Sequence, residues 1–203
     1  MVLKLILSCI CDCESDPIQK RNACSEFKKI LLRRRSNDYL YPMKMKCVGI
    51  GKTVSVYGLE QVQTYVKRIQ RFIPFEWVEL KEVKHHKNNP KTALQAEEEL
   101  IRKHLSDRDA LILFDEKGKQ MDSRAFAQFI DKHSVTHGGT LVFCLGGAYG
   151  FSDSLRKRAN GMVSLSPMTF PHQLVRVVAL EQLYRACTIN NHHPYHHWWI
   201  SWF

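Results

Sequence analysis

Short apolar runs alternate with amphipathic segments through most of this chain. The apolar runs predict buried strands at residues 44–49, 75–83, 110–114, 140–145 and 163–165. Between them, apolar positions recur at three- and four-residue steps, which predicts helices at about 59–71, 92–105, 123–133, 152–159 and 171–187. Strands that alternate with helices are typical of an α/β fold with a mostly parallel sheet flanked by helices.

Local signals predict where several of these elements begin and end. Pro74 should stop the first helix, and Thr92 and Gln95 have the spacing of a capping box. Asn160-Gly161 is a good helix C-cap, and Pro171 fits the first helical position. Asp115–Gly118 is expected to turn the chain after the third strand.

The last helix is apolar on nearly every side, which predicts burial on more than one face. We expect it to serve both the core and a homodimer interface. Its apolar residues are Leu174, Val175, Val177, Val178, Ala179, Leu180 and Leu183.

The two ends of the sequence lack the alternating strand and helix pattern of the middle. Residues 1–42 look like an extension to a domain at 43–197, either because translation starts near Met43 or because the extension is genuine and partly disordered. Residues 198–203 contain five large apolar side chains in six positions. Such a patch is costly if exposed, so it folds onto the domain or a partner subunit, or it is a frameshift or read-through product.

Charge and cysteine content narrow the class of protein. The formal net charge is +10, of which residues 1–42 carry +3 (eight Lys and Arg against five Asp and Glu) and the rest +7. This excess favours a polyanionic partner such as nucleic acid, or it is only a solubilising surface. The seven cysteines suit a reducing cytoplasm better than a disulfide framework. The apolar run at residues 2–10 is too short to span a bilayer.

A glycine-rich turn, Gly146-Gly147-Ala148-Tyr149-Gly150, follows the fourth strand. It lacks the spacing of a dinucleotide fingerprint and the Gly-Lys-Ser/Thr of a phosphate-binding loop. On its own, the turn is as consistent with a tight structural turn as with a ligand site. Loops after the last three strands should, however, converge at the carboxyl edge of a parallel sheet, where such sheets bind ligands.

An ordered set of segments resembles the ribosomal RNA large-subunit methyltransferase H family, within the knotted SPOUT superfamily. The segments are 165–176, 145–150, 181–186 and 194–197, and the resemblance covers about residues 43–197. It implies a C-terminal trefoil knot, a homodimer, and methyl transfer from S-adenosylmethionine to N3 of a pseudouridine in 23S rRNA on the assembled ribosome.

The resemblance also implies which residues contact the cofactor. Many family members have leucine where this chain has Phe114, a modest departure. Backbone groups of these residues would recognise adenine, and apolar side chains would enclose it. The implied cofactor contacts are Phe114, Gly146, Leu165, Ser166, Pro167, Met168, Thr169 and Phe170.

Catalytic and substrate roles follow in the same way. Arg176 would bind RNA phosphate or favour the anionic base, with His172, His196 or water accepting the proton. The alternative from the residues alone is a helix cap for His172 and a surface ion pair for Arg176. Tyr195, Arg185 and Arg156 are expected substrate contacts, and RNA backbone contacts are expected from Lys67, Arg68, Arg71, Arg156, Lys157 and Arg158.

Neither the cysteines near the N-terminus nor the histidines at 192, 193, 196 and 197 have the spacing of a structural zinc site, so we expect no metal. Two other functions stay open. The protein could be a related SPOUT methyltransferase that acts on tRNA, or a basic protein that grips rRNA without catalysis.

Overall fold

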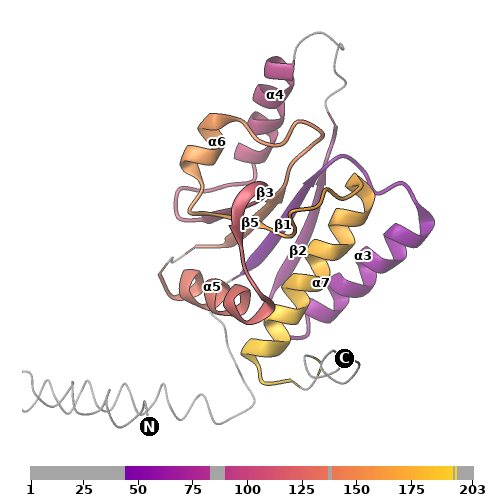
Figure 1. Ribbon diagram of the computed structural model, residues 1–203, viewed down its shortest axis with the longest axis vertical. Coiled ribbons are helices and arrows are strands. Elements are labelled where there is room, and N and C mark those ends of the chain that lie inside the picture. Colours follow the sequence, from indigo (N-terminus) through magenta and orange to yellow (C-terminus); the bar gives the residue numbers. More distant parts are fainter. Residues whose placement is uncertain (1–43, 83–89, 137–138, 194, 196–203) are drawn as a thin grey trace, which may run out of the picture. The chain divides into compact units, whose positions relative to one another are not determined.

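A five-stranded sheet forms the centre of the protein (Figure 1). The computed structural model describes residues 44–82, 90–136, 139–193 and 195. Every pairing in the sheet is parallel, and the strand order is β2-β1-β4-β3-β5. The strands are β1 (Met45–Ile50), β2 (Phe75–Leu80), β3 (Ala110–Gln120), β4 (Leu141–Leu145) and β5 (Gly161–Ser164). The predicted α/β fold with a parallel sheet is confirmed.

Helices cover both faces of the sheet (Figure 1). One face carries α3, α5 and α7, and the other carries α4 and α6. Their bounds are α3 (Val56–Ile69), α4 (Pro90–Arg102), α5 (Ser123–Thr136), α6 (Asp153–Arg158) and α7 (His172–Asn190). None of the helices in these described ranges is long and apolar enough to cross a membrane.

The side chains of each strand point alternately to the two faces of the sheet, and this divides the hydrophobic core into two clusters. In β4, Leu141, Phe143 and Leu145 face α3, α5 and α7, while Val142 and Cys144 face α4 and α6. All five are buried because helices cover both faces. Burial raises the pKa of Cys144 to about 12, so this cysteine stays a protonated core residue.

Three of the predicted helix boundaries are wrong by a few residues. α3 begins at Val56 instead of residue 59, since Ser55 serves as its N-cap and accepts a hydrogen bond from the backbone N–H of Gly58. α4 begins at Pro90, so Thr92 lies inside the helix and does not cap it. Pro171 is the N-cap of α7, one residue before the first helical position.

The C-terminal limits also shift. α7 runs to Asn190 instead of 187, and α4 ends at Arg102 instead of 105. The C-cap of α6 is Ala159. Asn160 follows the cap, and its side chain accepts a hydrogen bond from the backbone N–H of Leu111 in β3 at 2.8 Å. A residue expected to end a helix therefore also ties that helix end to the sheet.

The predicted turn at Asp115–Gly118 is wrong, because β3 continues to Gln120. The register between β3 and β5 shifts after Phe114, and pairing resumes at Lys119 with Val163. Gly118 packs so closely on β5 that a Cβ atom there would lie 2.5 Å from the carbonyl carbon of Val163. Local turn signals missed the extension because its pairing partner lies more than forty residues away in the sequence.

Several predicted segments lie outside the described residues. These include the extension at 1–42 and the tail at 198–203.

Candidate functional site

A cavity of about 580 Å³ opens at the carboxyl ends of β3, β4 and β5. These strands are neighbours in the sheet, so the loops that follow them meet at one edge, as expected for ligand sites in parallel sheets. All eight residues predicted to contact the cofactor line the cavity: Phe114, Gly146, Leu165, Ser166, Pro167, Met168, Thr169 and Phe170. The structure thus brings the predicted set together; that the set binds a cofactor stays a prediction.

The loop after β4 is a tight turn. The backbone N–H of Gly150 donates to the carbonyl of Gly147 at 3.1 Å, and Gly150 has a φ of 74°. A Cβ atom on Gly146 would lie 3.0 Å from the carbonyl oxygen of Gly150. Glycine is required at both positions for steric reasons. The loop is therefore at once a structural turn and part of the cavity wall.

The loop after β5 is held by local serine contacts. Ser164 donates from its hydroxyl to the carbonyl of Ser166 at 3.0 Å, and the hydroxyl of Ser166 accepts from the backbone N–H of Met168 at 2.9 Å. The Met168 side chain is 76% exposed. A large apolar side chain thus stands open to solvent at the mouth of the cavity.

An ion pair also contributes to the wall of the cavity. Arg156 of α6 donates from Nε to the buried carboxylate of Asp115 at 2.9 Å, and both residues line the cavity, as Glu116 does. Sequence patterns did not single out Asp115 and Glu116 as site residues, because both fell in the predicted turn. Their position directly after Phe114 was the one available signal.

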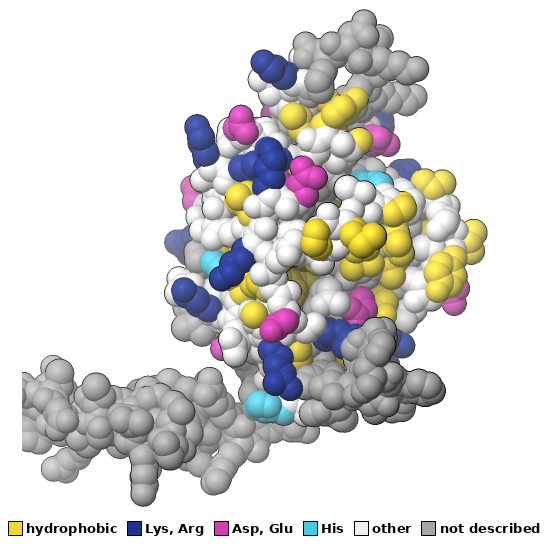
Figure 2. All heavy atoms as spheres, in the orientation of Figure 1, with side chains coloured by type: hydrophobic (Ala, Val, Ile, Leu, Met, Phe, Trp, Pro, Cys, Tyr) yellow, Lys and Arg dark blue, Asp and Glu magenta, His cyan; other side chains and the backbone are white. Residues whose placement is uncertain are grey.

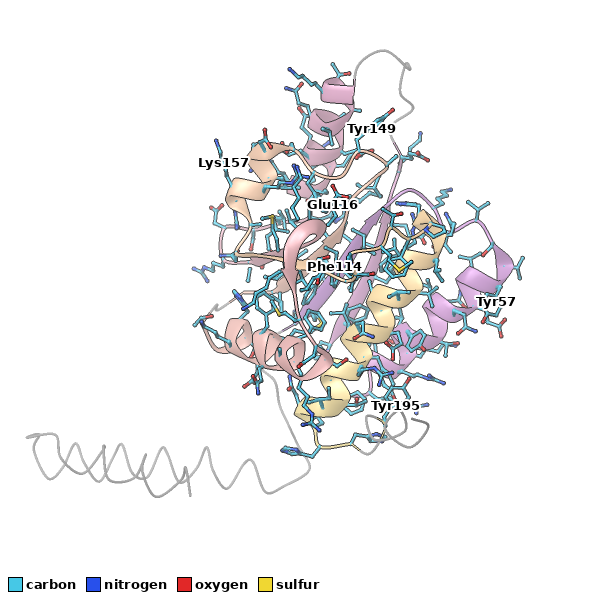
Figure 3. The ribbon with its side chains drawn as sticks, viewed as in Figure 1. Tyr57, Phe114, Glu116, Tyr149, Lys157 and Tyr195 are labelled. Carbon is cyan, nitrogen blue, oxygen red and sulfur yellow. The ribbon has the colours of Figure 1, made fainter. Side chains whose placement is uncertain are left out.

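The other residues predicted to contact RNA differ in their exposure and in their contacts within the protein. Arg158 donates to the backbone carbonyls of Ser106 and Asp109, so it helps to hold α6 against the domain. Lys157 is exposed and points outward from α6 (Figure 3). Lys67 of α3 and Arg71, which follows that helix, are exposed. Arg68 lies over the rings of Tyr65 and Tyr184.

His172 links the cavity to a buried polar network. Its ring lines the cavity, and Nε2 lies 2.7 Å from the carbonyl oxygen of Ile50 and 2.8 Å from Nη2 of Arg176. The predicted proximity of His172 and Arg176 on one helix face is confirmed.

Arg176 is fully buried, which the sequence did not predict. Nη2 donates to the carbonyl of Ile50 at 2.6 Å, and Nη1 donates to the hydroxyl of Thr53 at 2.8 Å. Nη1 also lies 3.4 Å from the carboxylate of Glu79, and Nε has no hydrogen-bond partner among the described residues. Burial lowers the pKa of the guanidinium, while Glu79 and Glu82 oppose that shift.

This geometry bears on both interpretations of Arg176. An ion pair with a nearby acid exists, but the expectation that it lies on the surface is wrong. Direct contact of Arg176 with RNA stays a prediction, and the side chain does not line the cavity among the described residues.

Tyr195 lies at the other end of α7 (Figure 3), and Arg185 lies in the C-terminal part of that helix. Arg185 donates to Glu181 at 3.0 Å and stands 5.2 Å from the centre of the Tyr195 ring. That ring packs edge-on against Tyr184 at 4.7 Å. At a rise of 1.5 Å per residue, about 20 Å of helix separates Arg185 from His172. Within one chain these predicted substrate contacts do not meet the cavity, and His196 lies outside the described residues.

An exposed apolar face surrounds the first turns of α3 and α7 (Figure 2). Val54, Val56, Tyr57 and Leu174, which we call the apolar face, are 78%, 83%, 72% and 48% exposed. Gln173 fixes the loop that carries this face, since its side chain donates to the carbonyl of Lys52 and accepts from the N–H of Val54.

Within the described part of the chain, no group of three or more His, Cys, Asp and Glu side chains is arranged to hold a metal ion.

Comparison with known proteins identifies the family. Residues 43–196 match the model of a family described as "Predicted SPOUT methyltransferase". Relatives named "Ribosomal RNA large subunit methyltransferase H" are 48% identical in Cytophaga hutchinsonii, over all of that protein and 76% of this chain, and 44% identical in Trichlorobacter lovleyi, with the same coverage. A crystal structure of a probable methyltransferase from Bordetella pertussis covers 72% of this chain and 96% of its own, with 13% identity and a TM-score of 0.43, too low to support an argument. By its family match and its relatives, the chain belongs to the SPOUT methyltransferase family.

Proposed function

We propose that the protein methylates N3 of a pseudouridine in 23S rRNA of the large ribosomal subunit, with S-adenosylmethionine as the methyl donor. The observation that carries the proposal is the cavity, whose walls contain every residue expected to contact the cofactor. The names of the relatives support the rRNA substrate. The proposal implies a cytoplasmic protein, because its substrate is the ribosome.

The cavity fits a cofactor of this kind. Its volume of about 580 Å³ lies in the usual range for small-molecule sites. Apolar side chains such as Leu165, Phe170 and Val175 can enclose an adenine, and the turn at 146–150 presents backbone groups to it. When bound, the cofactor supplies a methyl group that is already activated by its positive sulfur, so the protein's task is mainly to position the reactants.

His172 is the described histidine that could accept the N3 proton, because its ring lines the cavity. Arg176 contacts that ring and the Ile50 carbonyl from the buried side. We assign Arg176 a positioning role through His172, with electrostatic support of the anionic base as the finer possibility. His196 and water remain the alternative acceptors.

A homodimer would complete the site. Large exposed apolar side chains gathered on one surface are typical of protein interfaces, and the apolar face lies beside the loop pinned to α7 by Gln173. We propose that a second copy covers this face and that Tyr195 and Arg185 of each chain serve the partner's cavity. The C-terminal trefoil knot is part of the same proposal, supported by membership of the family.

RNA would approach across basic side chains. Lys67, Arg71 and Lys157 are exposed. Because each phosphate bound by such a side chain releases condensed counterions, the affinity for RNA should fall steadily as the salt concentration rises. Arg156 stands at the cavity edge, where its charge is offset by Asp115.

Two measurements test the proposal. Calorimetry of the full chain with S-adenosylmethionine should show binding at micromolar concentrations, and mass spectrometry of rRNA from a deletion strain should show loss of one methyl group from a 23S pseudouridine. A methyl group missing from tRNA instead would point to the tRNA-acting alternative. Absence of cofactor binding with retained rRNA binding would point to a non-catalytic binder.

A further inference from the structure

We propose that Glu97 of α4 is a positioning residue that holds the turn at 146–150 in the shape that binds the cofactor. The inference rests on the proposed function, because it takes the cavity as the cofactor site. It concerns a residue outside the cavity lining and outside all the motifs that identified the family.

The carboxylate of Glu97 is buried against the glycine turn. Glu97 is only 4% exposed. A Cβ atom added to Gly147 would lie 2.7 Å and 2.8 Å from its two carboxylate oxygens. A buried carboxylate is costly unless polar groups satisfy it, and the backbone of this turn lies against it. Glu97 therefore supports the turn without itself lining the cavity.

The next residue holds the far end of the same loop. Glu98 accepts a hydrogen bond from the hydroxyl of Ser152 at 2.5 Å, another from Ser154, and one from Arg102 at 2.7 Å. Ser152 is also the N-cap of α6. Burial works to raise the pKa of Glu98, but the hydrogen bonds outweigh it and bring that pKa below its ordinary value.

Together the two glutamates connect α4 to both ends of the segment 147–152. Gly147, Tyr149 and Gly150 of this segment line the cavity, and small displacements of positioning groups have large effects on binding and catalysis. Because α4 contributes no residue to the lining of the cavity as described, its influence on the cofactor has to pass through this loop.

The helix offers a matched control. Glu99 lies two residues after Glu97 in the same helix, but its side chain is exposed. We would measure the affinity of the full-length protein for S-adenosylmethionine by calorimetry, in the wild type, Glu97→Gln and Glu99→Gln. Loss of the negative charge that lies against the turn should raise the dissociation constant of Glu97→Gln about tenfold, while Glu99→Gln should match the wild type.

A double-mutant cycle separates positioning from general stability. Gly147→Ala places a methyl group against the Glu97 carboxylate, and Glu97→Asp shortens that side chain and makes room. The double variant should bind the cofactor more tightly than Gly147→Ala alone, whereas residues without contact give additive effects. Gly147→Ala combined with Glu99→Asp should show no such recovery. The cycle remains informative even if Glu97→Gln fails to fold, since it uses other substitutions.

The outcomes distinguish the two proposals. No binding by the wild type would overturn the proposed function. Binding by the wild type, with Glu97→Gln equal to Glu99→Gln or with additive effects in the cycle, would overturn the role of Glu97 alone.

Discussion

The two ends of α7 carry similar residues in opposite environments. Near the N-terminal end, Arg176 is fully buried and contacts a backbone carbonyl, a hydroxyl and His172. Nine residues later, Arg185 pairs with Glu181 at a partly exposed position, under the ring of Tyr195. The resemblance to the family implied a functional role for both arginines. The difference is one of environment: Arg176 is enclosed by its polar partners, whereas the side chain of Arg185 is partly exposed to solvent.

The largest expected effect comes from Arg176→Ala. It would leave the Ile50 carbonyl, Thr53 and Glu79 without their buried partner. Removing one member of a buried polar pair typically costs about 3–5 kcal/mol. Denaturant unfolding should show that loss in the free energy of unfolding. A variant with the same free energy of unfolding as the wild type would contradict the structural importance of the buried Arg176 contacts.

A smaller loss is expected for Gln173→Ala. Its side chain makes two hydrogen bonds to the loop that carries the apolar face, each worth about 1 kcal/mol at most in this exposed setting. The free energy of unfolding should fall by about 1 kcal/mol, and the dimer should dissociate at higher protein concentration in analytical ultracentrifugation. Gln182→Ala, in the middle of the same helix, serves as the control, and equal dimer dissociation in both variants would contradict the role of the loop.

Arg185→Ala should separate stability from activity. Its ion pair with Glu181 is partly exposed, and such pairs contribute about 1 kcal/mol or less. The unfolding free energy should therefore barely change, while methylation of ribosomes by the variant should fall by roughly tenfold or more if Arg185 serves the substrate. Wild-type turnover would remove Arg185 from the site.

The smallest effect concerns the pH dependence of Tyr195. Burial, and then the negative charge of Glu181, raise the pKa of its phenol to about 12 from an ordinary value of 10. Since the unfolded chain loses this proton first, the stability contributed by Tyr195 is present below pH 10 and falls as the pH rises toward 12. An ultraviolet difference titration against Tyr195→Phe should show late ionisation. A tyrosine that ionises near 10 would mean that the cluster does not form.

Periodicity predicted the α/β fold with its parallel sheet, and the family resemblance implied the residues that line the cavity. Apolar runs and helical periods reflect which side chains are buried, so each strand and helix among the described residues was predicted, with errors only at the ends. The loops after β3, β4 and β5 were expected to converge because parallel strands share a carboxyl edge. The extension of β3 was missed because pairing between Lys119 and Val163 is not a local property.

The roles of individual charged residues were harder to predict. Glu97, Glu98 and Glu99 form one polar run in the sequence, yet the first is buried, the second hydrogen-bonded and the third exposed. Asp115 and Arg156 pair across 41 positions. Charge and spacing do not encode which polar groups are removed from water, since burial depends on what packs against them from distant segments.

By itself, the sequence determined the class of fold, the family and the set of residues around the cavity, because these follow from periodicity and from ordered motifs. Only the tertiary structure decided that Arg176 lies inside the protein while Arg185 stays near the surface, and that Tyr195 rests far from the cavity of its own chain. The physical reason is that similar residue types can occur at both ends of one helix, whereas the burial of each side chain depends on the loops and strands that pack against that turn.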